Sequence, residues 1–184
     1  MSSLILWKNF LNAFHQCLSV TSGESFSAAW QSSTSRTKFY AGTLLKNVSD
    51  EMGLIFKKEE FKVDYTFCVT IENKYDVPIV FIESENVATS AHHEIRKLCC
   101  LHAPLKVLIV CAEWSNEKSG GYQDNLIKRW AAQIRSHNKI WPSPSITGVI
   151  VAEWNESLKY HVIAFDHFGE VVDKHRVFFE HGGS

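Results

Sequence analysis

Residues 78–86 read PIVFIESEN, an apolar run that ends in two acidic residues standing two positions apart, Glu83 and Glu85. Alternate residues of a β-strand point to opposite faces, so a strand here places both carboxylates on the face that carries Ile79 and Phe81. Carboxylates that share a face repel each other, and unpaired buried charge is costly. The pattern therefore predicts a cation or a shared proton beside them, unless they lie at a solvated edge of the sheet.

A third carboxylate comes from the preceding strand-like segment. Apolar and polar residues alternate through KVDYTF, residues 62–67, and Asp64 is one of the polar positions. If this segment and the strand that carries Glu83 form a hairpin, the side chains of Asp64 and Glu83 lie beside each other. Three oxygen donors with no His or Cys among them form a ligand set for a hard cation, Mg²⁺ or Mn²⁺ rather than Zn²⁺.

The order of these residues resembles the PD-(D/E)xK nuclease superfamily, which includes many restriction endonucleases and DNA-repair nucleases. Asp64 is followed by Glu83, Ser84 and Glu85 at the end of the next apolar strand, and then by a predicted helix. Val63 stands where the signature has proline, and Glu85 stands where it has lysine. Some restriction endonucleases also have glutamate at the latter position and are active. The order of the predicted elements extends the likeness to most of the chain.

The resemblance implies a hydrolase, a metal-dependent nuclease that cleaves DNA phosphodiester bonds through a metal-activated water. Asp64 and Glu83 would bind Mg²⁺ or Mn²⁺, and the backbone carbonyl of Ser84 would be a further ligand. Glu85 would act as a ligand or as the base that orients the attacking water. Glu51 is an additional candidate ligand, because family members often place a glutamate on the helix before the first strand.

The resemblance also implies a positive group near the scissile phosphate. In some superfamily members the lysine function has moved to the helix that follows the motif, which makes Lys97 the main candidate and Lys62 the other. Lys97 stands three residues after Glu94, so an ordinary ion pair on a helix surface is the stronger explanation for it.

Other polar and aromatic groups have structural explanations beside functional ones. The segment His92-His93-Glu94 invites a metal site, but adjacent helix residues face different directions, which favours a helix surface. Three basic residues share a face of one predicted helix, which is either a solvated face or a phosphate-binding face: Lys128, Arg135 and Lys139. Three tryptophans near strand or helix ends either pack in the core or stack on bases: Trp114, Trp141 and Trp154.

Periodicity and turn residues predict one domain over residues 1–184, with an N-terminal helix and loop extension over 1–35 and a core over 36–170. The expected class is α/β, a restriction-endonuclease-like core in which helices flank a central mixed sheet. The predicted elements are a helix over 4–18, a loop over 21–35, a helix over 36–52 closed by Gly53, strands over 54–60 and 61–70, the strand carrying Glu83 and Glu85, a helix over 89–102, a strand over 105–111, a helix over 122–138 after a turn at Gly120-Gly121, and strands over 146–154 and 159–166.

Composition bounds the other functional classes. Nineteen basic and 20 acidic residues give a net charge of −1, so any DNA-binding surface must be local. Five cysteines without a CxxC spacing favour reduced thiols and a cytoplasmic location over disulfides or a zinc site. No apolar run approaches the length of a membrane span, so no membrane partner, anchor or signal peptide is expected.

The expected partner is DNA, with RNA as an alternative, and a homodimer is compatible with cleavage of both strands. The competing hypothesis is a non-catalytic relative of the nuclease fold that binds nucleic acid or protein. The glutamate at position 85 and the near-neutral net charge both favour that competitor.

Overall fold

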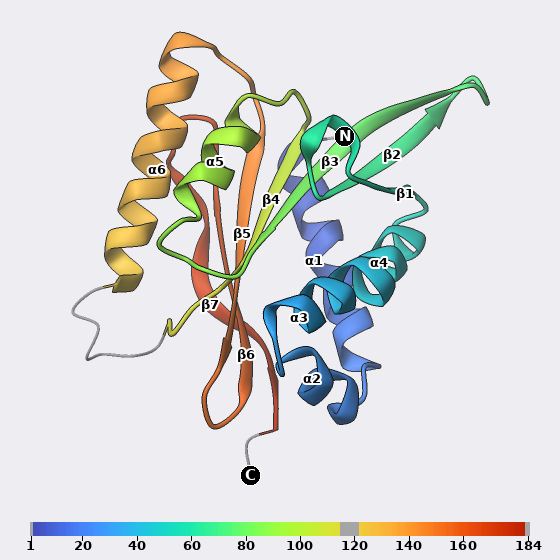
Figure 1. The fold of residues 1–184 in the computed structure, drawn as a ribbon. Coiled ribbons are helices and arrows are strands. Elements are labelled where there is room, and N and C mark those ends of the chain that lie inside the picture. The colour runs from blue at the N-terminus through green and yellow to red at the C-terminus, as the bar shows by residue number, and fades with distance from the viewer. Residues whose placement is uncertain (1, 115–121, 183–184) are drawn as a thin grey trace.

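The computed structural model describes residues 2–114 and 122–182, which form a seven-stranded mixed sheet with helices on both faces (Figure 1). This confirms the α/β class. The strands, which lie in the sheet in chain order, are β1 (Ile55–Lys58), β2 (Tyr65–Ile71), β3 (Tyr75–Glu85), β4 (Leu105–Cys111), β5 (Ile146–Trp154), β6 (Leu158–Phe165) and β7 (Val171–His181). The α-helices are α1 (Ser3–Ser19), α2 (Gly23–Ala29), α3 (Ser33–Phe39), α4 (Leu45–Glu51), α5 (His92–Cys99) and α6 (Tyr122–Ile140).

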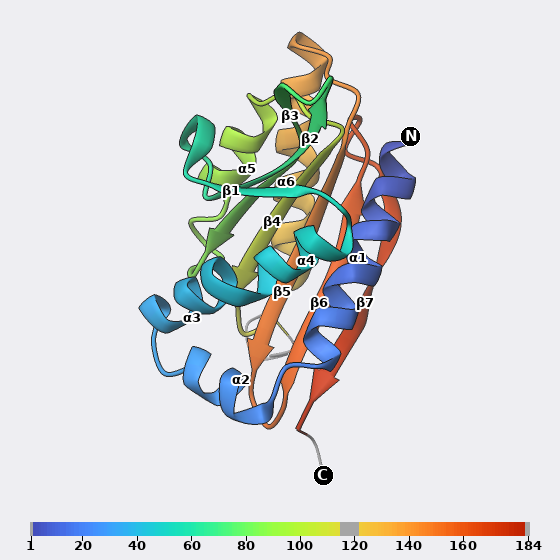
Figure 2. The same cartoon turned by 90° about the vertical axis from the view of Figure 1, so that its right-hand side faces the viewer.

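The sheet consists of two antiparallel parts joined by a parallel centre. Strands β1 to β3 pair antiparallel, β3, β4 and β5 pair parallel, and β5 to β7 pair antiparallel again. Parallel neighbours need a crossover connection, and helices α5 and α6 lie in the connections from β3 to β4 and from β4 to β5. Both crossover helices lie on one face of the sheet, whereas α1 to α4 cover the other face (Figure 2).

Each face has its own apolar core. Under α1 and α4 the core includes Trp7, Phe10 and Phe14, which the helical spacing of the first helix places on one side. Under α5 and α6 the core includes Ile95 and Trp130. Strand β4 is buried along most of its length because side chains on its two faces enter different cores. Among the described helices, none combines the length and the apolar character needed to cross a lipid bilayer.

The loop predicted over residues 21–35 is wrong, because short helices α2 and α3 occupy most of it. Ser22 and Ser32 cap these helices by accepting the backbone N–H of Ser25 and Ser35. A serine-rich composition is typical of loops, but serine is also a preferred N-cap residue. The helix predicted over 36–52 is confirmed as α3, a π-helical turn and α4, followed by Gly53 with a φ of 66°.

Strand β7 was not predicted, and it extends the sheet beyond the expected end of the core at residue 170. It is an edge strand, and its sequence mixes charged residues such as Asp173 and Arg176 with valines. Charges on an edge strand discourage pairing with other chains, and they also obscure the alternation by which a strand is recognised. The turn expected at Gly120-Gly121 lies outside the described residues.

The hairpin of β2 and β3 is confirmed, with one irregularity. Phe67 pairs with Val80 but Cys68 pairs with Pro78, so β3 has an extra residue at Ile79. The bulge turns Ile79 toward the core under α1 instead of leaving it on the face of Phe81 and Glu83. The predicted grouping of Ile79 with these residues is therefore wrong.

Candidate functional site

The acidic residues singled out by the sequence meet at the start of β2 and the end of β3. Tyr65 pairs with Ile82 in the antiparallel ladder, so the next position in each strand brings Asp64 opposite Glu83. This is the adjacency that a hairpin requires. Glu83 lies on the face covered by α5, and Lys97 reaches it from that helix.

Glu83 is the most constrained group of the site. Its side chain is 1% exposed, and its Oε2 lies 2.8 Å from Lys97 Nζ. Its Oε1 is buried without a hydrogen-bond partner among the described residues. Burial raises the pKa of Glu83 to about 8; the bond from Lys97 opposes this rise, and the nearby Asp64 adds to it. The site therefore holds a buried carboxyl group with one oxygen left to be satisfied.

Lys97 connects Glu83 to a second carboxylate on its own helix. Its Nζ also lies 2.8 Å from Glu94 Oε2, one helical turn away. Burial lowers the pKa of Lys97, but its bonds to Glu83 and Glu94 outweigh burial and raise it overall. Burial likewise raises the pKa of Glu94, and the bonds to Lys97 and Glu83 outweigh it and lower that pKa. The spacing of Glu94 and Lys97 predicts only a surface ion pair, whereas the structure also brings Glu94 to Glu83.

Asp64 and Glu85 are both oriented by backbone N–H groups. Asp64 Oδ2 accepts the N–H of Ser84 at 2.9 Å, and Glu85 Oε1 accepts the N–H of Val87 at 2.9 Å. Burial raises the pKa of Asp64, with the Ser84 bond and Lys97 opposing the rise. Thus Ser84 contributes its N–H to the cluster, and the carboxylate of Glu85 is turned toward the chain that follows β3.

Glu51 is not brought to this cluster. It ends α4 on the opposite face of the sheet, where it lines a surface hollow of about 320 Å³ together with Asn9, Ala13 and other residues of α1. Lys62 lies in a short 3₁₀ turn before β2 with a φ of 59°.

The donor chemistry of the cluster fits a hard cation, although the side chains do not form a ligand cage as they stand. Within residues 2–114 and 122–182, no three His, Cys, Asp or Glu side chains are grouped as metal ligands. Asp64, Glu83 and Glu94 nevertheless supply only carboxylate oxygens, which Mg²⁺ and Mn²⁺ prefer. The unsatisfied Oε1 of Glu83 is an acceptor available to such an ion.

The remaining histidine, basic and tryptophan candidates either pack against neighbouring residues or lie on the surface. His92 bonds to the Thr89 carbonyl and stacks on His93 rather than meeting Glu94 as a ligand. Arg135 contacts the carbonyl of Phe168 and the carboxylate of Glu170. Lys128 and Lys139 are exposed. Trp114 is buried, Trp154 contacts Trp30, and Trp141 is 72% exposed.

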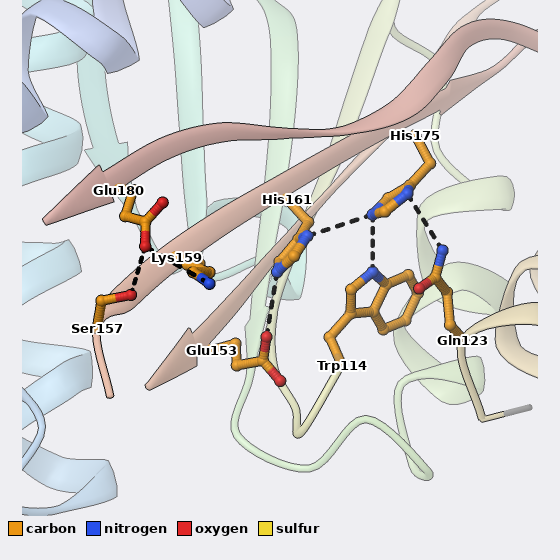
Figure 3. A network of polar contacts seen from close by, with 8 residues as sticks. All are labelled: Trp114, Gln123, Glu153, Ser157, Lys159, His161, His175 and Glu180. Atoms are coloured by element: carbon orange, nitrogen blue, oxygen red, sulfur yellow. Dashed lines mark hydrogen bonds and ion pairs between the residues drawn. The ribbon is translucent and has the colours of Figure 1, made fainter. Parts of the chain in front are cut away.

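Sequence analysis missed a second polar cluster, which contains Trp114, Gln123, Glu153, His161 and His175 (Figure 3). Two signals could have indicated it, His161 inside the mostly apolar strand over residues 158–165 and Glu153 near the end of the apolar run over residues 146–154. The partners come from elements far apart in the chain, so spacing alone could not assemble them.

No known protein-family model matches this chain, and no curated protein matches its sequence. A functional hypothesis therefore has to rest on the residues and their arrangement.

Proposed function

We propose that this protein is a metal-dependent nuclease of the PD-(D/E)xK type, which hydrolyses DNA phosphodiester bonds. The observation that carries the proposal is the buried Glu83, which faces Asp64 and Lys97 and has one carboxylate oxygen unsatisfied. Buried carboxyl groups with perturbed pKa values concentrate at functional sites.

The order of elements supports the same hypothesis. A helix, the antiparallel strands β1 to β3, the helix α5 and a strand β4 parallel to β3 follow one another as in a restriction-endonuclease-like core. Asp64 just before β2 and Glu83 near the end of β3 support the proposal, because the resemblance implies acidic residues at the corresponding points of such a core.

In this mechanism Asp64 and Glu83 would hold Mg²⁺ or Mn²⁺, and Glu94 would be an additional carboxylate beside Lys97. When bound, the metal ion supplies Lewis-acid chemistry and lowers the pKa of water at neutral pH. Lys97 provides the positive charge that the missing motif lysine would provide, and it stabilises charge on the scissile phosphate. Glu85 orients the attacking water or accepts its proton.

A non-catalytic binding module is the second candidate. Lys97 already forms ion pairs with Glu83 Oε2 and Glu94 Oε2, so a metal ion would have to displace its ammonium from at least one of them. The absence of a ready three-ligand group from the part of the chain that the structure describes favours this alternative. DNA is the preferred partner in both cases, with RNA as the competitor to include.

The deciding experiment is a calorimetric titration of Mg²⁺ and Mn²⁺, run beside a plasmid-nicking assay, on the wild type, Asp64→Asn and Asp50→Asn. Asp50 is a matched control, because it is a surface aspartate paired only with Lys46 in the described structure. The nuclease hypothesis expects binding and nicking to vanish in Asp64→Asn and to persist in Asp50→Asn. A wild type that binds no metal and leaves DNA and RNA intact contradicts it and favours the binding module.

A further inference from the structure

A chain of hydrogen-bonding groups runs from a buried carboxylate to the outer strand of the sheet (Figure 3). Glu153 Oε2 lies 3.2 Å from His161 Nε2, and His161 Nδ1 lies 3.3 Å from His175 Nε2. Trp114 Nε1 donates to the same His175 Nε2 at 2.9 Å. Gln123 Nε2 lies 3.1 Å from His175 Nδ1. We call these five residues the histidine network.

The histidine network ties together parts of the chain that are not neighbours in sequence. Trp114 follows β4, Gln123 lies in the first turn of α6, and Glu153, His161 and His175 come from β5, β6 and β7. Glu153 is 1% exposed and His161 is 3% exposed, whereas His175 is half-buried. His175 is therefore the histidine of the network that solvent protons reach more readily.

The indole group fixes the protonation state of His175. An indole N–H can only donate, so the Nε2 that receives it must carry a lone pair. A neutral His175 then carries its proton on Nδ1, facing Gln123. The side-chain amide of Gln123 can turn to present its oxygen to that proton, because its N and O atoms are interchangeable in assignment. A proton added to Nε2 would place two donors against each other.

We propose that the histidine network is a proton-controlled latch: neutral His175 fastens Trp114 to β7, and protonation of His175 at Nε2 releases it. Release would free the Trp114 side chain from β7. Trp114 also stacks on Trp130 of α6, with ring centroids 6.0 Å apart, so movement of Trp114 would change its packing against that helix. The latch is independent of the proposed nuclease activity.

The surroundings decide the order in which the two histidines take up protons. His161 is faced by Glu153 from β5, by His175 from β7 and, at longer range, by Lys159 of its own strand. A proton on His161 is shared with Glu153 and lets Nδ1–H donate to His175 Nε2, so the first proton keeps the latch closed. A second proton, on His175, is unfavourable for two reasons: its N–H would face the indole N–H, and its charge would be repelled by protonated His161, whose ring centroid is 5.3 Å away.

The sign of the pH dependence follows from burial. Burial lowers the pKa of His175, so its neutral form is favoured in the folded protein. Burial also lowers the pKa of His161, and the bond to Glu153 opposes that fall. The stability that the neutral latch contributes is present above the ordinary histidine pKa of about 6.5 and is lost as pH falls below it. The latch is expected to open in mild acid.

A metal ion is the competing occupant of the gap between the two rings. Two nitrogen ligands of tetrahedral zinc also lie roughly 3.3 Å apart, given Zn–N bonds of about 2.05 Å. Two observations favour the proton. No group of three metal-ligating side chains occurs among the described residues, and the Trp114 N–H already points at the His175 nitrogen that would bind the metal.

The test follows the indole N–H of Trp114 by ¹⁵N–¹H NMR in the full chain, with its resonance assigned from Trp114→Phe. As the pH falls from about 7.5 to about 5, the Trp114 N–H resonance should lose its hydrogen-bonded chemical shift. The midpoint of this change should equal the midpoint of the His175 ring titration and lie below the ordinary histidine pKa of about 6.5. In His175→Gln the amide oxygen accepts the indole N–H at every pH, so the titration should disappear. His167→Gln, at the turn between β6 and β7, is the matched control and should titrate like the wild type.

Two results overturn the proposal. One is a Trp114 resonance that keeps its shift while the His175 ring titrates. This result is measured on the wild type, so it can be obtained even if the His175→Gln variant fails to fold. The other is a Trp114 resonance that changes when EDTA or zinc is added at neutral pH, which assigns the histidine pair to a metal.

Discussion

Lys97 Nζ lies 2.8 Å from Glu83 Oε2 and 2.8 Å from Glu94 Oε2, so one ammonium group separates two carboxylates that would otherwise repel each other. The sequence predicted that a cation or a shared proton would accompany the acidic residue at the end of β3. In the described structure Lys97 provides the cation, and the second carboxyl group, which can share a proton with Glu83, comes from α5 rather than from Glu85.

Replacing Lys97 by Met should destabilise the protein, because it leaves Glu83 buried without its cation. We expect a loss of about 1–3 kcal/mol, below the value for a fully buried pair because Lys97 is partly exposed. The loss should increase with pH, since Glu83 can escape the penalty by protonation only in acid. Lys46→Met, which removes an exposed ion pair with Asp50, should change the free energy of unfolding by under about 0.5 kcal/mol. Urea unfolding at two pH values measures both, and equal effects of the two variants would contradict the assignment.

Stability of the metal-free protein should fall as pH rises toward 8. The folded-state pKa of Glu83 is about 8 against an ordinary value of 4.5, so the folded protein binds more protons than the unfolded chain between these values. The stabilisation is complete below the unfolded pKa and is lost as pH rises through the folded pKa, by a few kcal/mol. Glu83→Gln should remove this slope. Urea unfolding in EDTA across the range measures it, and the same slope in both proteins would show that another group is responsible.

Lys106 is a buried lysine inside the otherwise apolar strand β4. It is 1% exposed, and burial lowers its pKa. Because the unfolded chain then binds more protons than the folded one, its contribution to stability rises with pH. Lys106→Met should be neutral or should stabilise the protein by about 1 kcal/mol at neutral pH, since desolvation of the ammonium is avoided. Calorimetric melting measures this, and a large destabilisation would indicate that the ammonium has an essential structural role.

Gly148 is required because Trp7 packs directly against its backbone. A Cβ at position 148 would lie 2.3 Å from the Trp7 ring, so Gly148→Ala should cost about 1–3 kcal/mol or prevent folding. Gly42→Ala is the control, because its added Cβ meets no heavy atom within 4 Å apart from its chain neighbours and the backbone of its own helix. The control should be neutral or stabilising by up to about 1 kcal/mol. Comparable melting temperatures for the two variants would contradict the packing of α1 on β5.

Local sequence patterns predicted the helices, strands and hairpin whose formation depends on residues close together in the chain. The acidic pair at the end of β3 and the alternation before it predicted the hairpin, and with it the placement of Asp64 opposite Glu83. The serine-rich segment misled because serine both caps helices and fills loops, and the choice depended on whether Phe26 could be buried. Strand β7 escaped recognition because its charged residues obscure the alternation of an edge strand.

The sequence by itself determined the α/β class, most of the elements and the acidic hairpin, because periodicity and turn chemistry act over a few residues. Only the tertiary structure decided that Glu94 joins Lys97 at Glu83, that Glu51 faces the opposite side of the sheet, and that Glu153, His161 and His175 form one network. These relationships depend on how distant elements pack, since strand order and helix placement set which side chains share a dry interior. Charges on separate elements, such as Glu83 and Lys97, become paired only when that interior forms.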